Sequence, residues 1–264
     1  MNADQKDLSL DAIRREIDAI DDQLLDLLTR RIAAAEKVRA SKTQAGSLSA
    51  SPIRPNRESQ ILRRLTAQAN ASLSPGLLVR LWRIILSTST LAQAPVNIHI
   101  ARSLGQNVAL RVAISEHFGA TPVEEHDHDS AAVASLQSDP GDICLVKPDG
   151  HWFEAFVRGL AGGAGVIGSI PAIRTSVQPA LLILGHAQCQ PTGEDETLVL
   201  STGNLPRDFN PAALWQVRSG THVLSCLPGF LSDGEGPLAA LMRSNATLGL
   251  RIAGRYPSPL EVLS

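Results

Sequence analysis

The sequence has few cysteines, no long apolar run and almost no net charge, and each absence excludes a class of protein. Its three cysteines, Cys144, Cys189 and Cys226, are odd in number and widely spaced. They fit buried thiols in a reducing compartment better than a disulfide framework or a zinc site. No stretch approaches the roughly 18 apolar residues of a membrane-spanning helix. A formal net charge of -2 gives no reason to expect nucleic acid or an anionic membrane as a partner.

The composition changes at about residue 95. Before Gln93, glycine is rare and apolar residues recur with helical periodicity, whereas beyond Pro95 short apolar runs alternate with glycine and proline. The first pattern predicts helices, and the second predicts an α/β region. The polar start of the chain leads directly into an amphipathic pattern, so we expect no signal peptide and a cytoplasmic protein.

A first helix is predicted from Ser9, which can serve as its N-cap, to about Lys42. Its apolar face recurs at three- and four-residue steps in Ile13, Ile17, Ile20, Leu24 and Leu28. The same stripe continues to Arg31 and Lys42, which places two cations on or near a face that we expect to be buried. Either their apolar stems cover the core while the charges reach water, or the cations bind an anion.

Two further helices follow a flexible stretch that ends near residue 55. One begins at Asn56, and the other runs from Pro75 to Gln93. In the latter the periodicity predicts an inward face made of Leu77, Leu81, Ile84, Ile85 and Thr88. Ser89 and Gln93 are four residues apart and share one side of the helix. Buried polar groups need partners, so they either satisfy each other or bind a ligand.

Three segments occur in order along this helical half: LDAIRREIDAIDDQLLDLLTRRIAAAEKVRASK, RPNRE and LWRIILSTSTLAQ. With their charged residues in order and at workable spacing, they resemble the all-helical class of chorismate mutases. The resemblance covers nearly all of residues 8–95. It implies a three-helix domain that converts chorismate to prephenate.

The resemblance also assigns roles to residues. Arg14, Arg31 and Arg57 match positions that hold or frame the two substrate carboxylates, and Ser89 matches a further carboxylate contact. Bidentate guanidinium groups suit carboxylates because of their planar, forked donors.

Other matched positions act on the reacting centre. Lys42 and Gln93 match the residues that hydrogen-bond the ether oxygen of the breaking bond, and Glu58 matches the residue that fixes the ring hydroxyl. The reaction is an intramolecular rearrangement, so it requires a held conformer and stabilisation of developing charge. We therefore expect no cofactor, no metal and no acid/base pair.

The spacing of two arginines predicts the assembly. Arg14 and Arg31 lie seventeen residues apart on one helix, which is ~25 Å. A molecule the size of chorismate cannot bridge that distance. If both contact substrate, Arg14 serves a site built mainly by another subunit, so we expect an intertwined homodimer with two sites.

The second half resembles the dehydratase and regulatory half of bifunctional chorismate mutase/prephenate dehydratases. The segments ISEHFGA, GDICLVKPDG, ALLILGHAQCQPTGEDETLVLST and LRIAGRYPSPL follow that family's order, and the last two resemble strands of an ACT-type effector domain. However, Pro179-Ala180-Leu181 replaces the family's Thr-Arg-Phe triplet, and about 30 residues stand where a second lobe is expected. The resemblance thus implies a dehydratase-like remnant without its catalytic parts.

Two motifs in this half resemble ligand-binding motifs, but their sequence context favours a structural role. Gly163 to Gly168 (GAGVIG) spells a dinucleotide fingerprint, but it follows a helical stretch and leads into an apolar run, so we predict a helix-to-strand turn. The run from Glu124 to Asp129 (EEHDHD) contains metal-ligating residue types without metal-site spacing, so we predict a solvated polar loop.

The predicted fold is multi-domain: an all-α three-helix domain at 1–96, a reduced α/β dehydratase-like domain at 97–190, and an α+β ACT-like, ferredoxin-type domain at 191–264. The resemblance implies chorismate as substrate and an aromatic amino acid as a candidate effector. Three alternatives stay open. They are a bifunctional mutase–dehydratase, a pyruvate lyase that uses isochorismate on the same scaffold, and a non-catalytic module that senses such acids.

Overall fold

The computed structural model describes residues 10–44, 51–70 and 72–261, except for the side chains of residues 39 and 41–44. The chain divides into two compact units, Met1–Leu48 and Ser49–Ser264. This division falls inside the segment 1–96, which the sequence assigns to one domain, so the second and third helices share a unit with the α/β region. The three domain limits drawn from the sequence stay a prediction.

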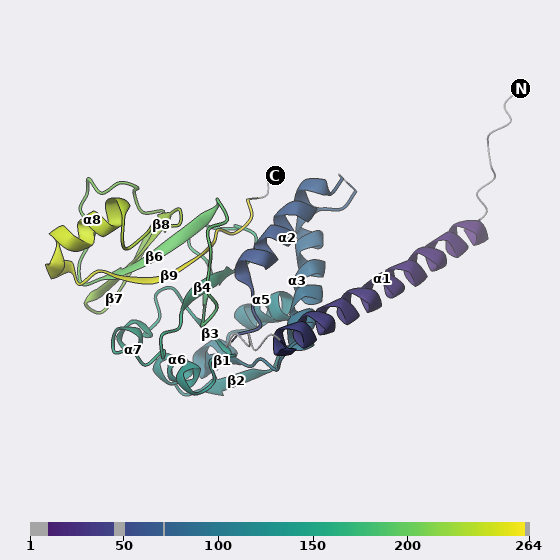
Figure 1. Ribbon diagram of the computed structural model, residues 1–264, viewed down its shortest axis with the longest axis horizontal. Helices are drawn as coiled ribbons and strands as arrows, with labels where there is room; N and C mark the ends of the chain where they lie inside the picture. Colours follow the sequence, from purple (N-terminus) through teal and green to yellow (C-terminus); the bar gives the residue numbers. More distant parts are fainter. Residues whose placement is uncertain (1–9, 45–50, 71, 262–264) are drawn as a thin grey trace, which may run out of the picture. The chain divides into compact units, whose positions relative to one another are not determined.

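Helix α1 (Leu10–Gln44) is one uninterrupted helix of 35 residues (Figure 1). It confirms the long first helix predicted to end at about Lys42, whereas the predicted N-cap, Ser9, lies outside the described residues. Its predicted apolar stripe is exposed along its length, from 38% at Ile13 to 52% at Leu24. In the described part of the chain, no helix is both long and apolar enough to cross a membrane.

Helices α2 (Pro55–Gln68) and α3 (Pro75–Leu91) confirm the second and third predicted helices. Each begins with proline, whose fixed φ suits the first helical position. The hydroxyl of Ser74 accepts a hydrogen bond from the backbone N–H of Leu77 at 3.3 Å and caps α3. The two helices pack through Leu62 and Leu78, and α3 also lies beside α5 (Val108–Phe118) (Figure 1).

One nine-stranded sheet forms the centre of the second unit, in the order β2-β1-β3-β5-β4-β9-β6-β8-β7. Its strands are β1 (Ile98–Ala101), β2 (Val123–His126), β3 (Ile143–Val146), β4 (Gly165–Ile170), β5 (Leu181–Gly185), β6 (Asp195–Ser201), β7 (Trp215–Ser219), β8 (His222–Pro228) and β9 (Arg251–Pro257). Strand β1 pairs in parallel with β2 and β3, whereas β9, β6, β8 and β7 are antiparallel to their neighbours within that group. The region after residue 96 is therefore mixed α/β, as predicted.

Different helices cover the two faces of the β1–β3 section. Ile98 and Ile143 belong to the same buried cluster as Phe118 of α5, whereas Cys144 belongs to a second cluster with Val133 of α6. Successive side chains of a strand point to opposite faces, so α5 covers one face and α6 the other. The other helices of the unit are α4 (Arg102–Gly105), α6 (Asp129–Ser138), α7 (Phe153–Val157), α8 (Gly236–Ser244) and the 3-10 turn η1 (Ala246–Leu248).

The two halves of the sheet join where β4 meets β9. The contact rests on one parallel pair, Val166 with Gly254. A Cβ atom added to Gly254 would lie 2.1 Å from the carbonyl oxygen of Val166. Only glycine therefore allows the backbones of β4 and β9 to approach each other this closely.

The predicted inward face of α3 is wrong. Leu77, Leu81 and Ile84 are 44–48% exposed, and Thr88 is also exposed. The face that is buried carries instead Leu78, Val79, Arg83, Leu86, Ser87 and Ser89. The reason is that α3 has two apolar stripes, and helical periodicity alone does not decide which of them meets α2 and α5.

Of the two predictions made for short motifs in the second half, the turn at the glycine motif is confirmed and the loop at the acidic run is wrong. Gly162 and Gly163 adopt positive φ angles in the turn before β4 begins at Gly165, which confirms the predicted helix-to-strand turn. The predicted polar loop at 124–129 is wrong, because its first residues form the edge strand β2 and Asp129 opens α6. A strand paired on one side only tolerates such polar, charged side chains.

Candidate functional site

The first unit contains three residues that the sequence assigns to a binding site, all on α1. The guanidinium of Arg14 lies 3.5 Å from the carboxylate of Asp11, and both side chains are mostly exposed. Exposed pairs of this kind contribute little to stability, so Arg14 is free to exchange Asp11 for another anion. The side chain of Lys42 lies outside the described residues.

Arg31 differs from Arg14 in its surroundings. It is half-buried, and desolvation lowers the pKa of its guanidinium from the usual value. A guanidinium remains charged at every physiological pH. Arg31 is therefore a partly desolvated cation, and a low local dielectric strengthens the attraction between such a cation and a carboxylate.

In the second unit, Glu58 of α2 forms a buried ion pair with Arg83 of α3. A carboxylate oxygen of Glu58 lies 2.6 Å from a guanidinium nitrogen of Arg83, and the two side chains are only 14% and 10% exposed. The Nε–H of Arg83 donates a second hydrogen bond, at 3.2 Å, to the backbone carbonyl of His117 on α5. Arg83 thus links α2, α3 and α5. Arg57, the neighbour of Glu58, is exposed.

The pair leaves one carboxylate oxygen of Glu58 outside the Arg83 contact, because only Oε2 takes part in it. Burial and the nearby Arg83 charge lower the pKa of His117 well below its usual value, so this imidazole is neutral at physiological pH. His117 therefore adds no second positive charge beside Arg83, and the ion pair with Arg83 holds the side chain of Glu58 in place.

Ser89 and Gln93 lie one turn apart near the end of α3. The hydroxyl of Ser89 donates to the backbone carbonyl of Ile85 at 2.7 Å, and the side-chain amide of Gln93 donates to the carbonyl of Ser89 at 3.0 Å. Both side chains thus donate to backbone carbonyls of α3, which ends at Leu91. The amide of Gln93 still has one N–H and its oxygen available for a ligand.

Arg83 lines three cavities, and Glu58 lines two of them. The largest of the three has a volume of about 540 Å³ and is lined by Leu77, Arg80, Arg83, Glu116, His117 and Ile173. The other two, of about 80 Å³ and 20 Å³, are both lined by Glu58, Arg83 and Phe118. Arg83 therefore borders all three spaces.

The structure does not bring the seven predicted residues into one described site. Glu58, Ser89 and Gln93 belong to one unit with Arg57, whereas Arg14 and Arg31 belong to the other. Sequence reasoning missed Arg83. A signal for it existed, because Arg83 stands four residues after Val79 and three before Leu86, on a stripe that is otherwise apolar.

Comparison with known proteins identifies the helical segment. Residues 13–94 match the family model described as Chorismate mutase type II. A curated protein of Pseudomonas aeruginosa, named bifunctional chorismate mutase/prephenate dehydratase, is 30% identical over 139 residues. That match covers 50% of this chain and 37% of the relative, so the chain spans little more than a third of the relative's length. Residues 13–94 are thus similar to chorismate mutases of type II, and the likeness to the second protein, which spans 139 residues, extends beyond that segment.

One solved structure is also similar, that of a protein titled "GqqA- a novel type of quorum quenching acylases". It matches with a TM-score of 0.39 and 14% sequence identity, over 61% of this chain and 95% of that chain. A likeness this distant carries no argument about fold or activity.

The buried pair generates a prediction about stability. Removing one member of a buried pair leaves an unpaired charge and typically costs about 3–5 kcal/mol. We expect Glu58→Ala to lower the free energy of unfolding by about this amount, measured by urea denaturation. Arg80 and Glu116 form an exposed pair on the neighbouring helices, 3.1 Å apart, so Glu116→Ala is the matched control and should cost under about 1 kcal/mol. Equal losses in the two variants would contradict the role given to Glu58 and Arg83.

Proposed function

We propose that this protein is a chorismate mutase that converts chorismate to prephenate in the biosynthesis of aromatic amino acids. One observation carries the proposal: the match to the Chorismate mutase type II model spans residues 13–94, the segment that holds all seven candidate residues. The proposed substrate contacts are made by Arg14, Arg31, Lys42, Arg57, Glu58, Ser89 and Gln93.

The residue types suit the proposed chemistry. Chorismate carries two carboxylates, and its rearrangement breaks a carbon–oxygen bond while negative charge develops on the ether oxygen. Arginines pair with the carboxylates in bidentate geometry, whereas the ammonium of Lys42 and the amide of Gln93 donate to the ether oxygen. Donors fixed in advance stabilise developing charge without having to reorganise at the moment of reaction.

The pair between Glu58 and Arg83 supports the role given to Glu58. A carboxylate that accepts a hydrogen bond from a substrate hydroxyl must be held in a fixed position. Arg83 anchors Oε2 at 2.6 Å, while Oε1 is left to accept from the ring hydroxyl. In this proposal Arg83 acts through Glu58 and is a positioning residue.

A homodimer with shared sites is part of the proposal. In the described part of the chain, the apolar stripe of α1 and the stripe Leu77, Leu81 and Ile84 of α3 are both exposed. Burial of apolar area contributes about 25 cal/mol per Å², so a second copy that covers these stripes gains substantial free energy. Arg14, ~25 Å from Arg31 along α1, would then complete the partner's site.

The alternatives differ in their products. An isochorismate-using lyase on the same scaffold would release pyruvate and salicylate, and a bifunctional enzyme would release phenylpyruvate. The second is disfavoured by Pro179-Ala180-Leu181 at the position of the dehydratase triplet. We therefore propose a dehydratase-like remnant for residues 97–190 and prephenate as the product.

We propose an ACT-like, effector-binding role for residues 191–264. The four strands of this segment, β6, β7, β8 and β9, lie side by side in the order β9-β6-β8-β7. Counted from one to four along the segment, this order is 4-1-3-2, and α8 connects the third strand to the fourth. That arrangement supports a ferredoxin-type segment. Two features depart from the type: residues 202–214 replace the first helix, and Cys226 to Phe230 (CLPGF) stand at the position of the effector motif.

Activity measurement with a matched pair of arginine variants tests the mutase proposal. Loss of one charged contact to the substrate costs about 10²–10³-fold in kcat, so Arg31→Ala should lose that much in an assay of chorismate disappearance. Arg30→Ala is the control, because Arg30 is exposed and pairs with Asp26 at 3.4 Å; it should stay within about twofold of the unchanged chain. Absence of prephenate among the products of the unchanged chain would rule out the proposal.

Mixed dimers test the shared site. Chains with Arg14→Ala and chains with Arg31→Ala should each be inactive alone. Co-expressed, they form heterodimers in which one site carries both changes and the other carries neither, so purified heterodimers should recover about half of the unchanged activity. The control mixes Arg31→Ala with Lys42→Ala, which we place in the same site, and it should recover nothing. Failure of the Arg14 and Arg31 pair to recover activity would refute sharing.

Phenylalanine titration tests the proposed effector role. Added to the chorismate assay, phenylalanine should lower the rate of the full chain in a dose-dependent way, because binding to one conformation shifts the population away from the other. Tryptophan and leucine serve as controls for non-specific effects. A flat response to phenylalanine would contradict the effector role while leaving the mutase proposal untouched.

A further inference from the structure

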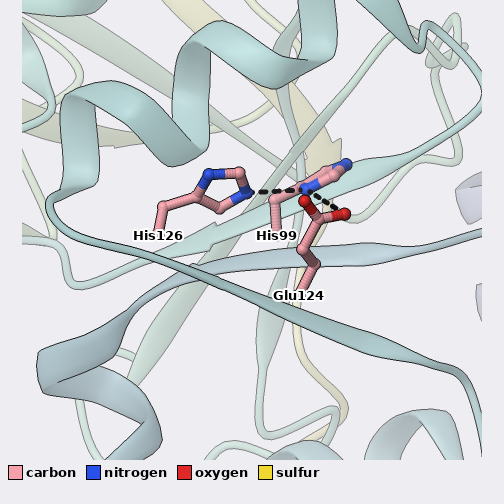
Figure 2. Close-up of side chains that lie close together, drawn as sticks. All are labelled: His99, Glu124 and His126. Atoms are coloured by element: carbon pink, nitrogen blue, oxygen red, sulfur yellow. Dashed lines mark hydrogen bonds and ion pairs between the residues drawn. The ribbon is translucent and has the colours of Figure 1, made fainter.

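A cluster of two histidines and a glutamate lies on the sheet, outside the residues given to the mutase site. One ligand atom from each of His99, Glu124 and His126 lies within 4.8 Å of the others. Figure 2 shows the three side chains converging, with His126 and Glu124 both directed at the imidazole of His99. In the part of the chain that the structure describes, these three are the metal-ligating side chains that lie close enough together to bind one ion.

The strand pairing explains why the three side chains meet. His99 of β1 stands directly opposite Glu124 of the parallel strand β2, and His126 follows Glu124 by two residues. Side chains two apart on one strand share a face, so all three project from the same side of the sheet. That side is the one that α6 covers, since His99 is also the register partner of Cys144.

The distances fit a four-coordinate ion. Nδ1 of His99 lies 2.9 Å from Nε2 of His126 and 3.7 Å from a carboxylate oxygen of Glu124. Bond lengths of about 2.0–2.1 Å to a tetrahedral Zn²⁺ place ligand atoms about 3.3 Å apart. The two measured separations lie on either side of this value, so small side-chain rotations suffice to seat an ion.

The buried carboxylate of Asp142 orients the imidazole of His99 so that Nδ1 can bind a metal ion. Nε2 of His99 lies 3.1 Å from Oδ2 of Asp142, and Asp142 also accepts from the backbone N–H of Asn97 at 2.8 Å. Because a carboxylate only accepts, the proton of a neutral His99 is on Nε2, and Nδ1 offers a lone pair. Ligand histidines in metalloproteins are typically held by a carboxylate in this way.

The cluster also has a route to solvent. His99 is buried at 3% side-chain exposure, whereas the Glu124 side chain is 60% exposed on the edge strand. Nearby charged groups have other partners, since Arg102 pairs with Asp127 at 3.0 Å and Asp129 accepts from the backbone N–H of His151 at 2.8 Å. An ion can therefore enter past Glu124 without breaking these contacts.

We infer that His99, Glu124 and His126 bind a divalent transition-metal ion of the Zn²⁺ class, with Asp142 as positioning residue. Two imidazoles and one carboxylate suit Zn²⁺, and three protein ligands leave the fourth position for water. The site belongs to the sheet and is independent of the proposed mutase activity.

Metal titration of the full, untagged chain tests the inference. After removal of metal by a chelator, Zn²⁺ is followed by calorimetry and Co²⁺ by its visible absorption. We expect one ion per chain, with visible bands typical of four-coordinate Co²⁺. Glu124→Gln and His126→Ala should each weaken Zn²⁺ binding at least tenfold, and Asp142→Asn should weaken it about 10–100-fold.

His128→Ala is the matched control. His128 is exposed, lies two residues from His126, and makes no side-chain bond to the start of α6, so its loss should leave both Zn²⁺ affinity and the Co²⁺ spectrum unchanged. Because Glu124 is exposed, Glu124→Gln should keep the circular dichroism spectrum of the unchanged chain. Binding that is equal in the unchanged chain and in Glu124→Gln, or that falls equally in His128→Ala and His126→Ala, would overturn the inference.

Discussion

The exposed apolar face of α1 is the constraint on which the proposed function depends. Isoleucine and leucine recur at helical spacing from Ile13 to Leu28, and in one copy of the chain the side chains of this stripe are between 38% and 52% exposed. Monomeric proteins seldom leave a contiguous apolar stripe of this length in water. A helix of 35 residues also gains most of its stability from the packing of its apolar face and less from intrinsic propensity. We therefore expect the apolar stripe of α1 to be buried in an interface, and we propose a second copy of the chain as the partner.

The same constraint determines how the proposed site can be built. Arg14 and Arg31 stand on one straight helix, too far apart for a single small dianion. Pairing of two copies would bring the Arg14 of one chain near the Arg31 of the other. Within the second unit, by contrast, the Glu58–Arg83 pair is complete in one chain, because both partners and the His117 carbonyl belong to it. Dimer formation would then bring Arg14 of one chain and Arg31 of the other to one site. The ion pair with Arg83 would fix the position of the Glu58 carboxylate within each chain.

Local sequence signals predicted the helical elements well. The starts predicted at Ser9, Asn56 and Pro75 lie within about one residue of the starts of α1, α2 and α3. The orientation of α3 could not be read in this way, because Leu77 and Leu78 both begin apolar stripes, and tertiary packing alone chooses between them. Arg83 was missed for the same reason, since its burial depends on Glu58, which is 25 residues distant in sequence.

Long-range pairing explains the remaining differences. The run Glu124 to Asp129 looks like a loop because it is highly charged, yet an edge strand needs only one partner, and β1 provides it. His99 lies in the apolar run Ile98–Ala101, where a single histidine gives no hint of a ligand. Only the register of β1 and β2 places it opposite Glu124. Seven candidate residues were identified by resemblance, whereas their proposed gathering would depend on contacts between chains that periodicity cannot reveal.

The mass of the protein in solution tests the central claim most directly. Sedimentation analysis should give twice the chain mass of 28.1 kDa. Leu24→Glu, which puts a charge in the middle of the α1 stripe, should reduce the mass to that of one chain. Val108→Glu is the control, because Val108 is 74% exposed at the start of α5, and this variant should keep the doubled mass. A mass of 28.1 kDa for the unchanged chain would contradict the shared-site account.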